Sequence, residues 1–299
     1  MRPFSGFAAL AALTTLISCS SLGPSVPKPA GKNRVDTLVF AERSFAALAR
    51  SEDTRTAFLS FLDDSSIIFR PDPVNGIAAV TAQAVRPHIL VWEPAYADVS
   101  TSGEVGYTTG PAFLARRASP DSVLWHGHFV SFWAKNRSGE WKVLLDVGTG
   151  NDPPAIPSAA FLPGPLSTLP RTGPGETCSC NESVEEAEAR LQEALRTAPP
   201  ENAYRGVLAG DARLYRDGQF PVVGRELAIS ALSAVPGQIL CEPIRSWGSA
   251  AGDLGCAYGR YRRRVEERIA EHGYYVRIWR SFGGERMHLV LDLLSPVTP

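Results

Sequence analysis

The sequence predicts an α+β protein built from two copies of one folding unit, and three observations lead to this prediction. First, residues 89–110 (ILVWEPAYADVSTSGEVGYTTG) recur as residues 240–259 (LCEPIRSWGSAAGDLGCAYG), and residues 126–147 recur as residues 272–293. Second, each copy begins with apolar residues at helical spacing and ends with alternating segments between turn residues. Third, a stretch rich in proline and glycine separates the copies, as is typical of a linker. A unit that occurs twice in one chain indicates a tandem duplication.

In the first copy, apolar spacing predicts a helix at residues 36–50, and Asp53 or Thr54 can cap the next helix. The further elements expected are a helix at 55–62, a strand at 65–70, a helix at 76–84 and strands at about 90–100, 104–116, 122–134 and 141–148. Gly, Pro, Asp and Ser residues between the last four strands predict an antiparallel meander, with the helices over one face of the sheet.

Both faces of that sheet look buried. On the third of the four strands, His126, Val130 and Phe132 lie on one face, whereas Phe129 and Trp133 lie on the other. Helices can cover one face, and the second copy is the available cover for the other. The sequence therefore predicts a pseudo-twofold pairing of the two sheets within one chain, an intramolecular pseudo-dimer.

The second copy repeats the order of elements. Ser183 can cap a helix that runs to Arg196, and Glu186 completes a capping box. The remaining elements expected are a short helix after Pro199, a strand at 212–216, a helix at 224–234 and four strands that end near residue 294. The predicted organisation is a signal peptide at 1–18, a tether at 19–33, domain 1 at 34–150, a linker at 151–181 and a divergent domain 2 at 182–296.

The amino-terminal segment predicts export and lipidation. Arg2 precedes an apolar run at residues 7–17 that is too short to cross a bilayer as a helix. The run ends in Leu-Ile-Ser-Cys, which resembles the bacterial lipobox, and this resemblance implies that Cys19 is diacylated. Because a serine follows Cys19, the resemblance also implies the periplasm and the outer membrane. An ordinary secretory signal with a chance cysteine is the alternative.

Four cysteines remain in the exported chain, an even number that favours disulfides over a metal site. In the alignment of the copies, Cys241 replaces Trp92 and Cys256 replaces Tyr107. We expect these two positions to face each other on neighbouring strands, so that a disulfide joins Cys241 and Cys256. Cys178 and Cys180 are the candidates for a second pair, with each other or with a partner chain. No metal and no cofactor are expected.

The first copy resembles the nuclear transport factor 2-like superfamily, and within it the SnoaL-like branch of exported bacterial proteins. The likeness rests on residues 42–45, Trp92-Glu93-Pro94, residues 99–110, 127–133 and 139–146, and the second copy shares it more weakly. It implies two tandem cone-shaped domains, each a curved, mainly antiparallel sheet wrapped around about three helices with a pocket at the mouth. Members of the superfamily include ketosteroid isomerases and polyketide cyclases as well as binding domains, so the fold does not decide the function.

Residues present in one copy only are free to serve a local site. Trp92, Tyr107 and His128 belong to this group, because Tyr274 replaces His128. His128 could act as a general base while Tyr107 polarises a carbonyl oxygen. An aromatic core with a hydrogen-bonded histidine is the other interpretation.

Residues kept in both copies are first read as structural, among them Glu93, His126, Trp133 and Asp146. Asp146 also remains a candidate base. The ligand-binding candidates are Trp92, Tyr107, His128 and Trp133, and the catalytic candidates are His128, Tyr107 and Asp146.

The charge balance, with 30 basic and 31 acidic residues, argues against nucleic acid as a partner. One basic run in the second copy reads as a solvated surface, with anionic lipid or polysaccharide as the alternative ligand; it contains Arg260, Arg262, Arg263, Arg264 and Arg268. We expect a lipid-anchored periplasmic module that binds a small apolar molecule or a protein partner, and not an enzyme. The alternatives are an isomerase or cyclase that acts on a small apolar carbonyl compound in the domain 1 pocket, and a protein that neutralises a secreted partner.

Overall fold

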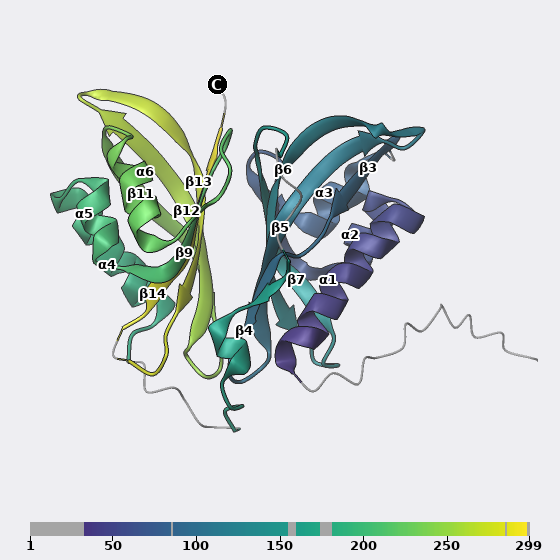
Figure 1. The fold of residues 1–299 in the computed structure, drawn as a ribbon, viewed down its shortest axis with the longest axis horizontal. Helices are drawn as coiled ribbons and strands as arrows, with labels where there is room; N and C mark the ends of the chain where they lie inside the picture. Colours follow the sequence, from purple (N-terminus) through teal and green to yellow (C-terminus); the bar gives the residue numbers. More distant parts are fainter. Residues whose placement is uncertain (1–32, 85, 155–159, 174–180, 285, 298–299) are drawn as a thin grey trace, which may run out of the picture. The chain divides into compact units, whose positions relative to one another are not determined.

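A computed structural model describes residues 33–84, 86–154, 160–173, 181–284 and 286–297. The chain from residue 31 to residue 299 forms one compact unit, in which each copy builds one sheet and three helices (Figure 1). The predicted signal segment with Cys19, and the predicted pair of Cys178 and Cys180, lie outside the described residues. Within the described ranges, no helix is long and apolar enough to span a membrane.

The first copy forms an eight-stranded sheet in the order β2-β1-β7-β6-β5-β4-β8, with β3 also paired to β5. Its elements are α1 (Arg34–Ser51), α2 (Thr54–Phe61), β1 (Leu62–Phe69), β2 (Pro73–Asn75), α3 (Gly76–Ala82), β3 (His88–Trp92), β4 (Tyr96–Val99), β5 (Val105–Arg116), β6 (Ser119–Lys135), β7 (Trp141–Gly150) and β8 (Leu162–Pro163). The predicted meander is present, and β1 joins its end in parallel with β7.

The strand expected at residues 90–100 is two strands, β3 and β4. Pro94 lies between them and has no N–H to donate to the sheet. The chain there bends tightly over Gly110, where an added Cβ would lie 2.0 Å from the carbonyl oxygen of Glu93. The second copy shows the same close approach, with a Cβ on Gly259 only 2.2 Å from the carbonyl oxygen of Glu242. This contact explains why a glycine stands at this position in both copies.

The second copy forms a six-stranded sheet in the order β10-β9-β14-β13-β12-β11. Its elements are α4 (Val184–Thr197), α5 (Pro200–Arg205), β9 (Leu208–Arg216), β10 (Val222–Val223), α6 (Arg225–Ser233), β11 (Gln238–Gly248), β12 (Leu254–Val265), β13 (Arg268–Arg280) and β14 (His288–Pro296). The fold class expected from the sequence is therefore confirmed: two tandem α+β units, each a mainly antiparallel sheet with three helices.

Helix starts follow local capping chemistry. Asp53 accepts a hydrogen bond from the backbone N–H of Thr56 at 2.9 Å and caps α2. Ser183 and Glu186 form the predicted capping box at the start of α4. These side chains satisfy backbone N–H groups that have no partner within the helix.

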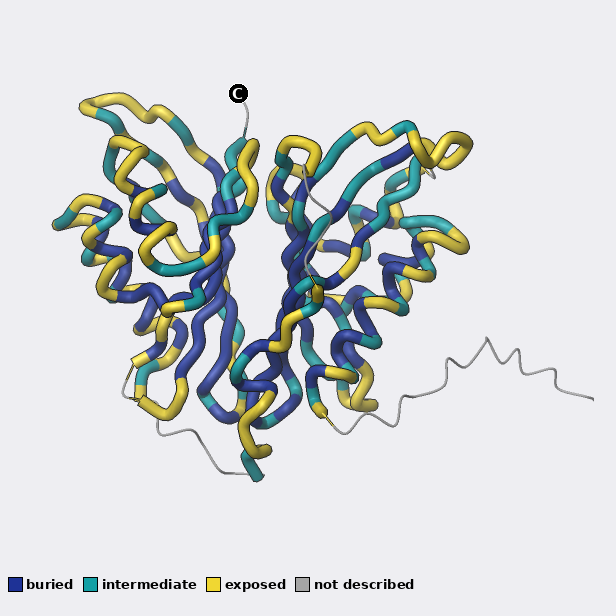
Figure 2. The backbone as a smooth tube through the Cα atoms, in the orientation of Figure 1, coloured by how far each residue is buried: buried dark blue, intermediate teal, exposed yellow. Residues whose placement is uncertain are grey.

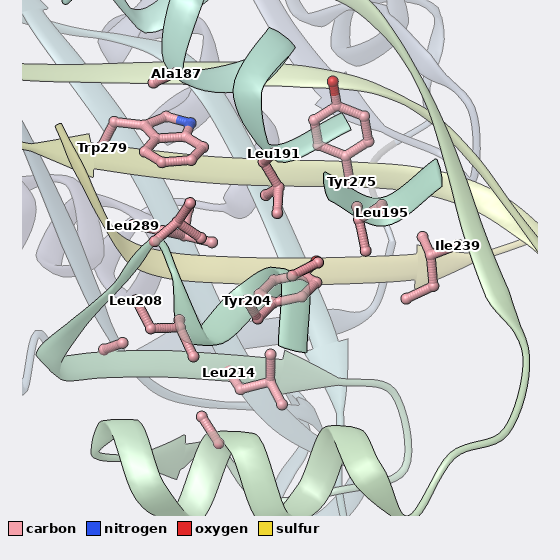
Figure 3. Close-up of a cluster of buried hydrophobic side chains, with 14 of the residues drawn as sticks. Ala187, Leu191, Leu195, Tyr204, Leu208, Leu214, Ile239, Tyr275, Trp279 and Leu289 are labelled. Atoms are coloured by element: carbon pink, nitrogen blue, oxygen red, sulfur yellow. The ribbon is translucent and has the colours of Figure 1, made fainter. Parts of the chain in front are cut away.

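Each sheet buries both faces, as expected from the alternation on β6. In the first copy, one face packs against the helices through residues such as Phe45, Phe58, Phe129 and Trp133. The second copy repeats this arrangement, and Figure 3 shows Leu191 of α4 between Trp279 and Tyr275 of the sheet, and Tyr204 of α5 near Leu208 and Leu214. In Figure 2 the strands carry long buried stretches, whereas the outer turns of the helices are exposed.

The opposite faces of the two sheets share a third apolar cluster, which we call the interface cluster. It contains residues of both copies: Phe69, Tyr96, Val105, Tyr107, Val130, Phe132, Leu145, Val147, Leu166, Ala209, Tyr215, Leu254, Cys256, Tyr258, Val276, Ile278, Val290, Leu291 and Leu293. Burial of this apolar surface holds the two copies together.

The contacts across the interface cluster come in equivalent pairs. The ring centroids of His128 and Tyr215 lie 6.3 Å apart, and those of the equivalent residues Tyr274 and Phe69 lie 6.1 Å apart. Likewise, the backbone N–H of Thr101 donates to Asp253 at 2.9 Å. In the equivalent bond, the backbone N–H of Ala250, which aligns with Thr101, donates to Glu104, which aligns with Asp253, at 2.6 Å. These paired contacts follow pseudo-twofold symmetry.

The described part of the linker packs on the first copy. β8 pairs in parallel with β4, and the 3₁₀ helix η1 (Pro165–Thr168) follows. The buried carboxylate of Asp98 accepts hydrogen bonds from the backbone N–H and the hydroxyl of Ser167, each at 2.9 Å. A linker held in this way limits how far the two copies can separate.

The predicted disulfide between Cys241 and Cys256 is wrong, because both cysteines are free. They do lie on paired strands, but Cys241 is opposite Tyr261 and Cys256 is opposite Trp247. Cys241 packs against the helix side of the sheet, whereas Cys256 belongs to the interface cluster. Trp92 and Tyr107 divide between the two faces of the first sheet in the same way. The alignment of the copies therefore holds, and the inference of facing side chains does not.

Candidate functional site

A cavity of about 630 Å³ opens between the two copies. On one side it is bounded by β5 and β6, on the face of the first sheet that is turned toward the second copy, and on the other side by β9, β10 and the turn between β9 and β10. We call it the interface pocket. It is lined by Ala95, Tyr96, Thr109, Gly110, Pro111, Ala112, Phe113, Val123, His126, Gly127, His128, Asn151, Pro154, Ala160, Leu162, Arg213, Tyr215, Phe220, Pro221 and Val223. Mostly apolar walls with a few convergent polar groups are the usual composition of a small-molecule site, and such sites often lie between domains.

One polar group of the interface pocket is His128. Its Nδ1 lies 2.7 Å from Oδ1 of Asn151, and Nδ2 of Asn151 donates to the backbone oxygen of Asp152 at 2.6 Å. Asn151 therefore presents its oxygen, so Nδ1 of His128 carries the proton and Nε2 is an acceptor. Burial lowers the pKa of His128, and the hydrogen bond to Asn151 acts in the opposite direction. His128 is thus a neutral hydrogen-bonding group near pH 7.

The second polar group is Arg213 on β9. Its guanidinium lies over the Tyr96 ring, with Cζ 3.6 Å from the ring centroid, and Nη1 donates to the backbone oxygen of Asp211 at 3.3 Å. On the same face of β9, the hydroxyl of Tyr215 lies 2.8 Å from Oγ1 of Thr109. The cation–π contact orients the guanidinium.

Two of the predicted ligand-binding residues, Trp92 and Trp133, lie on the helix side of the first sheet around the buried carboxyl of Glu42. Trp92 Nε1 donates to Glu42 Oε1 at 2.5 Å, and Trp133 Nε1 donates to Oε2 at 3.1 Å. Thr108 Oγ1 lies 2.5 Å from Oε2. Burial raises the pKa of Glu42 to about 7, although the hydrogen bonds act to lower it.

Asp146, the candidate base, lies on the same side and pairs with Ser131, whose hydroxyl donates to Oδ2 at 2.9 Å. Burial raises the pKa of Asp146 as well. A separate cavity of about 310 Å³ lies near the ends of α2 and α3, between Phe58 and Trp125, with Arg55, Arg70 and Arg86 among its polar lining. Neither Glu42 nor Asp146 lines it.

The structure divides the predicted site residues between the two faces of the first sheet. Tyr107 and His128 lie on the face toward the second copy, and Trp92, Trp133 and Asp146 lie on the helix side. Tyr107 is buried in the interface cluster and does not line the interface pocket. Tyr107 and His128 are therefore not brought to one cavity as a catalytic pair. Glu93 is an exposed partner of Arg43, with Oε1 2.7 Å from Nε.

In the second copy Arg277 stands at the position of Ser131, and Asp292 stands at the position of Asp146. Arg277, buried on the helix side, binds Glu188 through Nη1 at 3.0 Å and Asp292 through Nε at 2.8 Å. Tyr204 donates to Asp292 at 2.9 Å, and Arg216 binds it at 2.6 Å. Satisfied buried charges of this kind form a structural network.

Several arginines of the basic run are engaged locally. Arg263 pairs with Glu271 at 3.4 Å, Arg262 with Glu242 at 3.5 Å, and Arg264 donates to Gln238 at 2.8 Å. Among the residues that the structure describes, no three His, Cys, Asp or Glu side chains are grouped closely enough to hold a metal ion.

Sequence reasoning missed Glu42 and Arg213. Glu42 could have been found, because residues 41–50 (AERSFAALAR) align with residues 187–196 (AEARLQEALR) and share the glutamate. Arg213 carries no such signal, since it stands where the first copy has Ile67.

No protein-family model and no curated protein matches this sequence. Among solved structures, a ketosteroid isomerase-like protein from Erwinia carotovora atroseptica is 16% identical over 40% of this chain and 99% of its own length, with a TM-score of 0.33. An NTF2-like protein of unknown function from Pseudomonas putida is 15% identical over 39% of this chain and 85% of its own, with a TM-score of 0.32.

A protein of unknown function with a cystatin-like fold from Nostoc punctiforme is 15% identical over 38% of this chain and 89% of its own, with a TM-score of 0.31. Each of these matches spans about as much of the chain as one copy.

Proposed function

We propose that this chain is a binding module of the nuclear transport factor 2-like superfamily, with tandem SnoaL-like domains, that holds a small, largely apolar molecule in the interface pocket. The observation that carries the proposal is the pocket itself: about 630 Å³ of space, walled by Pro111, Phe113, Val123 and Phe220. Such a volume is within the range of small-molecule sites. The two copies would act together, as an intramolecular pseudo-dimer, because each supplies one wall.

A binding role is favoured over catalysis by what surrounds the polar groups. Catalysis of proton transfer needs an acid or base within hydrogen-bond reach of the substrate. In the interface pocket His128 is held by Asn151, and no carboxyl group is among the described lining residues. The interface pocket therefore offers His126 and His128 without a carboxyl partner among the described lining residues, which favours orientation and burial of a ligand over proton transfer.

Binding of a neutral naphthylamine reporter, whose fluorescence rises in apolar surroundings, tests this function. Val123, partly exposed on β6, lines the interface pocket, and a Val123→Trp variant would fill the space. The matched control is Ile269→Trp, which places the same ring on the exposed hairpin of the second copy. We expect saturable binding to the wild type and the control, and at least tenfold weaker binding to Val123→Trp. Equal binding to all three proteins would contradict the proposal.

We further propose that a lipid on Cys19 anchors the module to the outer membrane from the periplasmic side. The support is the resemblance of residues 16–19 to a lipobox. Two or more acyl chains hold a protein stably on a membrane. Fractionation of cells that express the wild type or Cys19→Ala tests this, with membrane association expected only for the wild type. A soluble wild-type protein without acyl mass on its first peptide would contradict it.

A second candidate is an isomerase or cyclase in the first copy. It is supported by two buried carboxyl groups, Glu42 with a pKa raised to about 7 and Asp146 with a raised pKa, but neither lines the interface pocket or the cavity near α2 and α3. Carboxyl groups with raised pKa values suit proton abstraction next to a carbonyl. Deuterium exchange at the α-carbon of a small apolar ketone, measured by NMR with wild type and Glu42→Gln, tests this candidate. Exchange catalysed by the wild type and lost in the folded variant would favour the enzyme.

A further inference from the structure

The described lining of the interface pocket contains a permanent positive charge and no carboxylate, and this charge indicates more about the ligand than that it is apolar. Among the described residues that line it, Arg213 alone has a permanent charge, and none is an aspartate or glutamate. Arg213 is nine-tenths buried. A buried cation is costly unless an anion or several hydrogen bonds compensate it.

The nearby carboxylates are already used by another arginine. Arg280 binds Asp211 through Nη2 at 2.6 Å and through Nη1 at 3.0 Å, and its Nη1 also lies 3.6 Å from Asp98. Arg213 reaches only the backbone oxygen of Asp211, through Nη1. Within the described part of the chain, therefore, no carboxylate forms an ion pair with Arg213.

The rest of the guanidinium is held in a fixed orientation. The Tyr96 ring covers one face, and a planar guanidinium over an aromatic ring still presents its N–H groups at its edge. These donors match the two oxygens of a carboxylate, which arginine binds in a bidentate manner. From Arg213 the pocket continues along apolar walls formed by Pro111, Phe113 and Phe220.

We infer that the ligand of the interface pocket is an amphiphilic monoanion, an apolar molecule with a carboxylate that pairs with Arg213. This inference rests on the proposed binding function and specifies its ligand class. The carboxylate would neutralise the cation, while the apolar part covers the walls. A neutral ligand of the same shape would leave Arg213 with only the Coulombic attraction of Asp211, and a cationic ligand would be repelled.

Three probes with the same chain and different head groups test the inference: octanoic acid, 1-octanol and octylamine, each titrated at neutral pH against the full chain by displacement of the naphthylamine reporter. We expect the wild type to bind octanoate about tenfold or more tighter than octanol, because a charged hydrogen bond stabilises a complex more than a neutral one. Octylamine should bind most weakly.

The decisive variant is Arg213→Gln, and Arg137→Gln is its control, since Arg137 is an exposed residue between β6 and β7. Arg213→Gln should lose the preference for octanoate and keep its affinity for octanol, which also shows that the pocket is intact. A second variant, Arg213→Lys, keeps the positive charge and should retain part of the preference for octanoate. If Arg213→Gln does not fold, Arg213→Lys still tests the role of the charge.

The outcomes separate the two proposals. Equal binding of octanoate and octanol to the wild type, or a preference for octanoate that persists in Arg213→Gln, would contradict the inference that the ligand carries a carboxylate bound by Arg213. The proposed apolar binding site would not be affected by either result. If none of the three probes binds the wild type, the binding function itself is wrong.

Discussion

At the scale of single residues, Glu42 shows how the sequence and the fold create an unusual group. The carboxyl is fully buried between two indoles and a threonine, where desolvation favours its neutral form. When protonated it can donate to Thr108, which accepts as readily as it donates. The equivalent Glu188 binds Trp279 Nε1 at 2.6 Å, so the glutamate–tryptophan contact tethers the first helix to the sheet in both copies.

Glu42 makes stability depend on pH. Its pKa is raised from 4.5 to about 7, so its stabilising contribution is complete below about pH 4.5 and is lost as the pH rises through about 7. The free energy of unfolding of the wild type should therefore fall by up to about 3 kcal/mol from this group between pH 5 and pH 8. Denaturant unfolding of wild type and Glu42→Gln at both values checks this. A pH dependence identical in the two proteins would argue against it.

Both described cysteines should behave as thiols. Burial raises the pKa of Cys256 well above its usual value, and Cys241 is also raised. We expect Cys256 to react with iodoacetamide only after unfolding, and a reducing agent to leave the melting temperature unchanged. Non-reducing peptide mapping is the measurement, and a peptide that joins Cys241 to Cys256 would contradict the structure.

At the scale of elements, the two copies use the same strands with different interiors. β6 places Ser131 beside Asp146, whereas β13 places Arg277 beside Asp292. The replacement of the serine by an arginine turns a contact between two residues into a network that also includes Glu188. We expect the network to be structural in the second copy, whereas the first copy keeps a simpler polar interior.

Arg277→Ser should destabilise the protein by about 3–5 kcal/mol, because it leaves the buried carboxylate of Glu188 without a cation and leaves Asp292 with Arg216 alone. The control Arg262→Ser removes an exposed arginine from the neighbouring strand and should cost less than about 1 kcal/mol. Denaturant unfolding of the two variants at neutral pH compares them. Equal losses would mean that the network adds nothing beyond a surface ion pair.

The elements that the sequence predicted are those with a strong local signal. Asp53 and the Ser183–Glu186 box mark helix starts through their own chemistry, and the duplication predicts the order of strands. Strand register is different, because a shift of one residue exchanges the two faces. The contact between Cys241 and Cys256 depended on register and failed, because the two side chains lie on opposite faces. Tyr107 and His128 do share a face, but Tyr107 is opposite Phe132 and His128 is opposite Pro111, so they lie apart along the strands. Arg213 could not be found because the Tyr96 ring that covers its guanidinium belongs to the other copy.

At the scale of the whole molecule, the two sheets share one interface cluster, so the copies should unfold together. Ile278 is fully buried in that cluster, whereas Ile269 on the same strand is exposed. Ile278→Asp should lower stability by about 3 kcal/mol or more, and Ile269→Asp by less than about 1 kcal/mol. Circular dichroism and tryptophan fluorescence should report one coincident transition. Two separate transitions in the wild type would show that the copies are independent.

The central claim is that the ligand binds between the two copies and not inside either of them. Hydrogen exchange measured by mass spectrometry, with and without octanoate, tests this most directly. Binding between the copies should slow exchange in residues 95–96, 109–113, 213–215 and 220–223, the segments that contribute lining residues to the interface pocket. Protection confined to residues 53–58 and 80–90, around the separate cavity of the first copy, would contradict it.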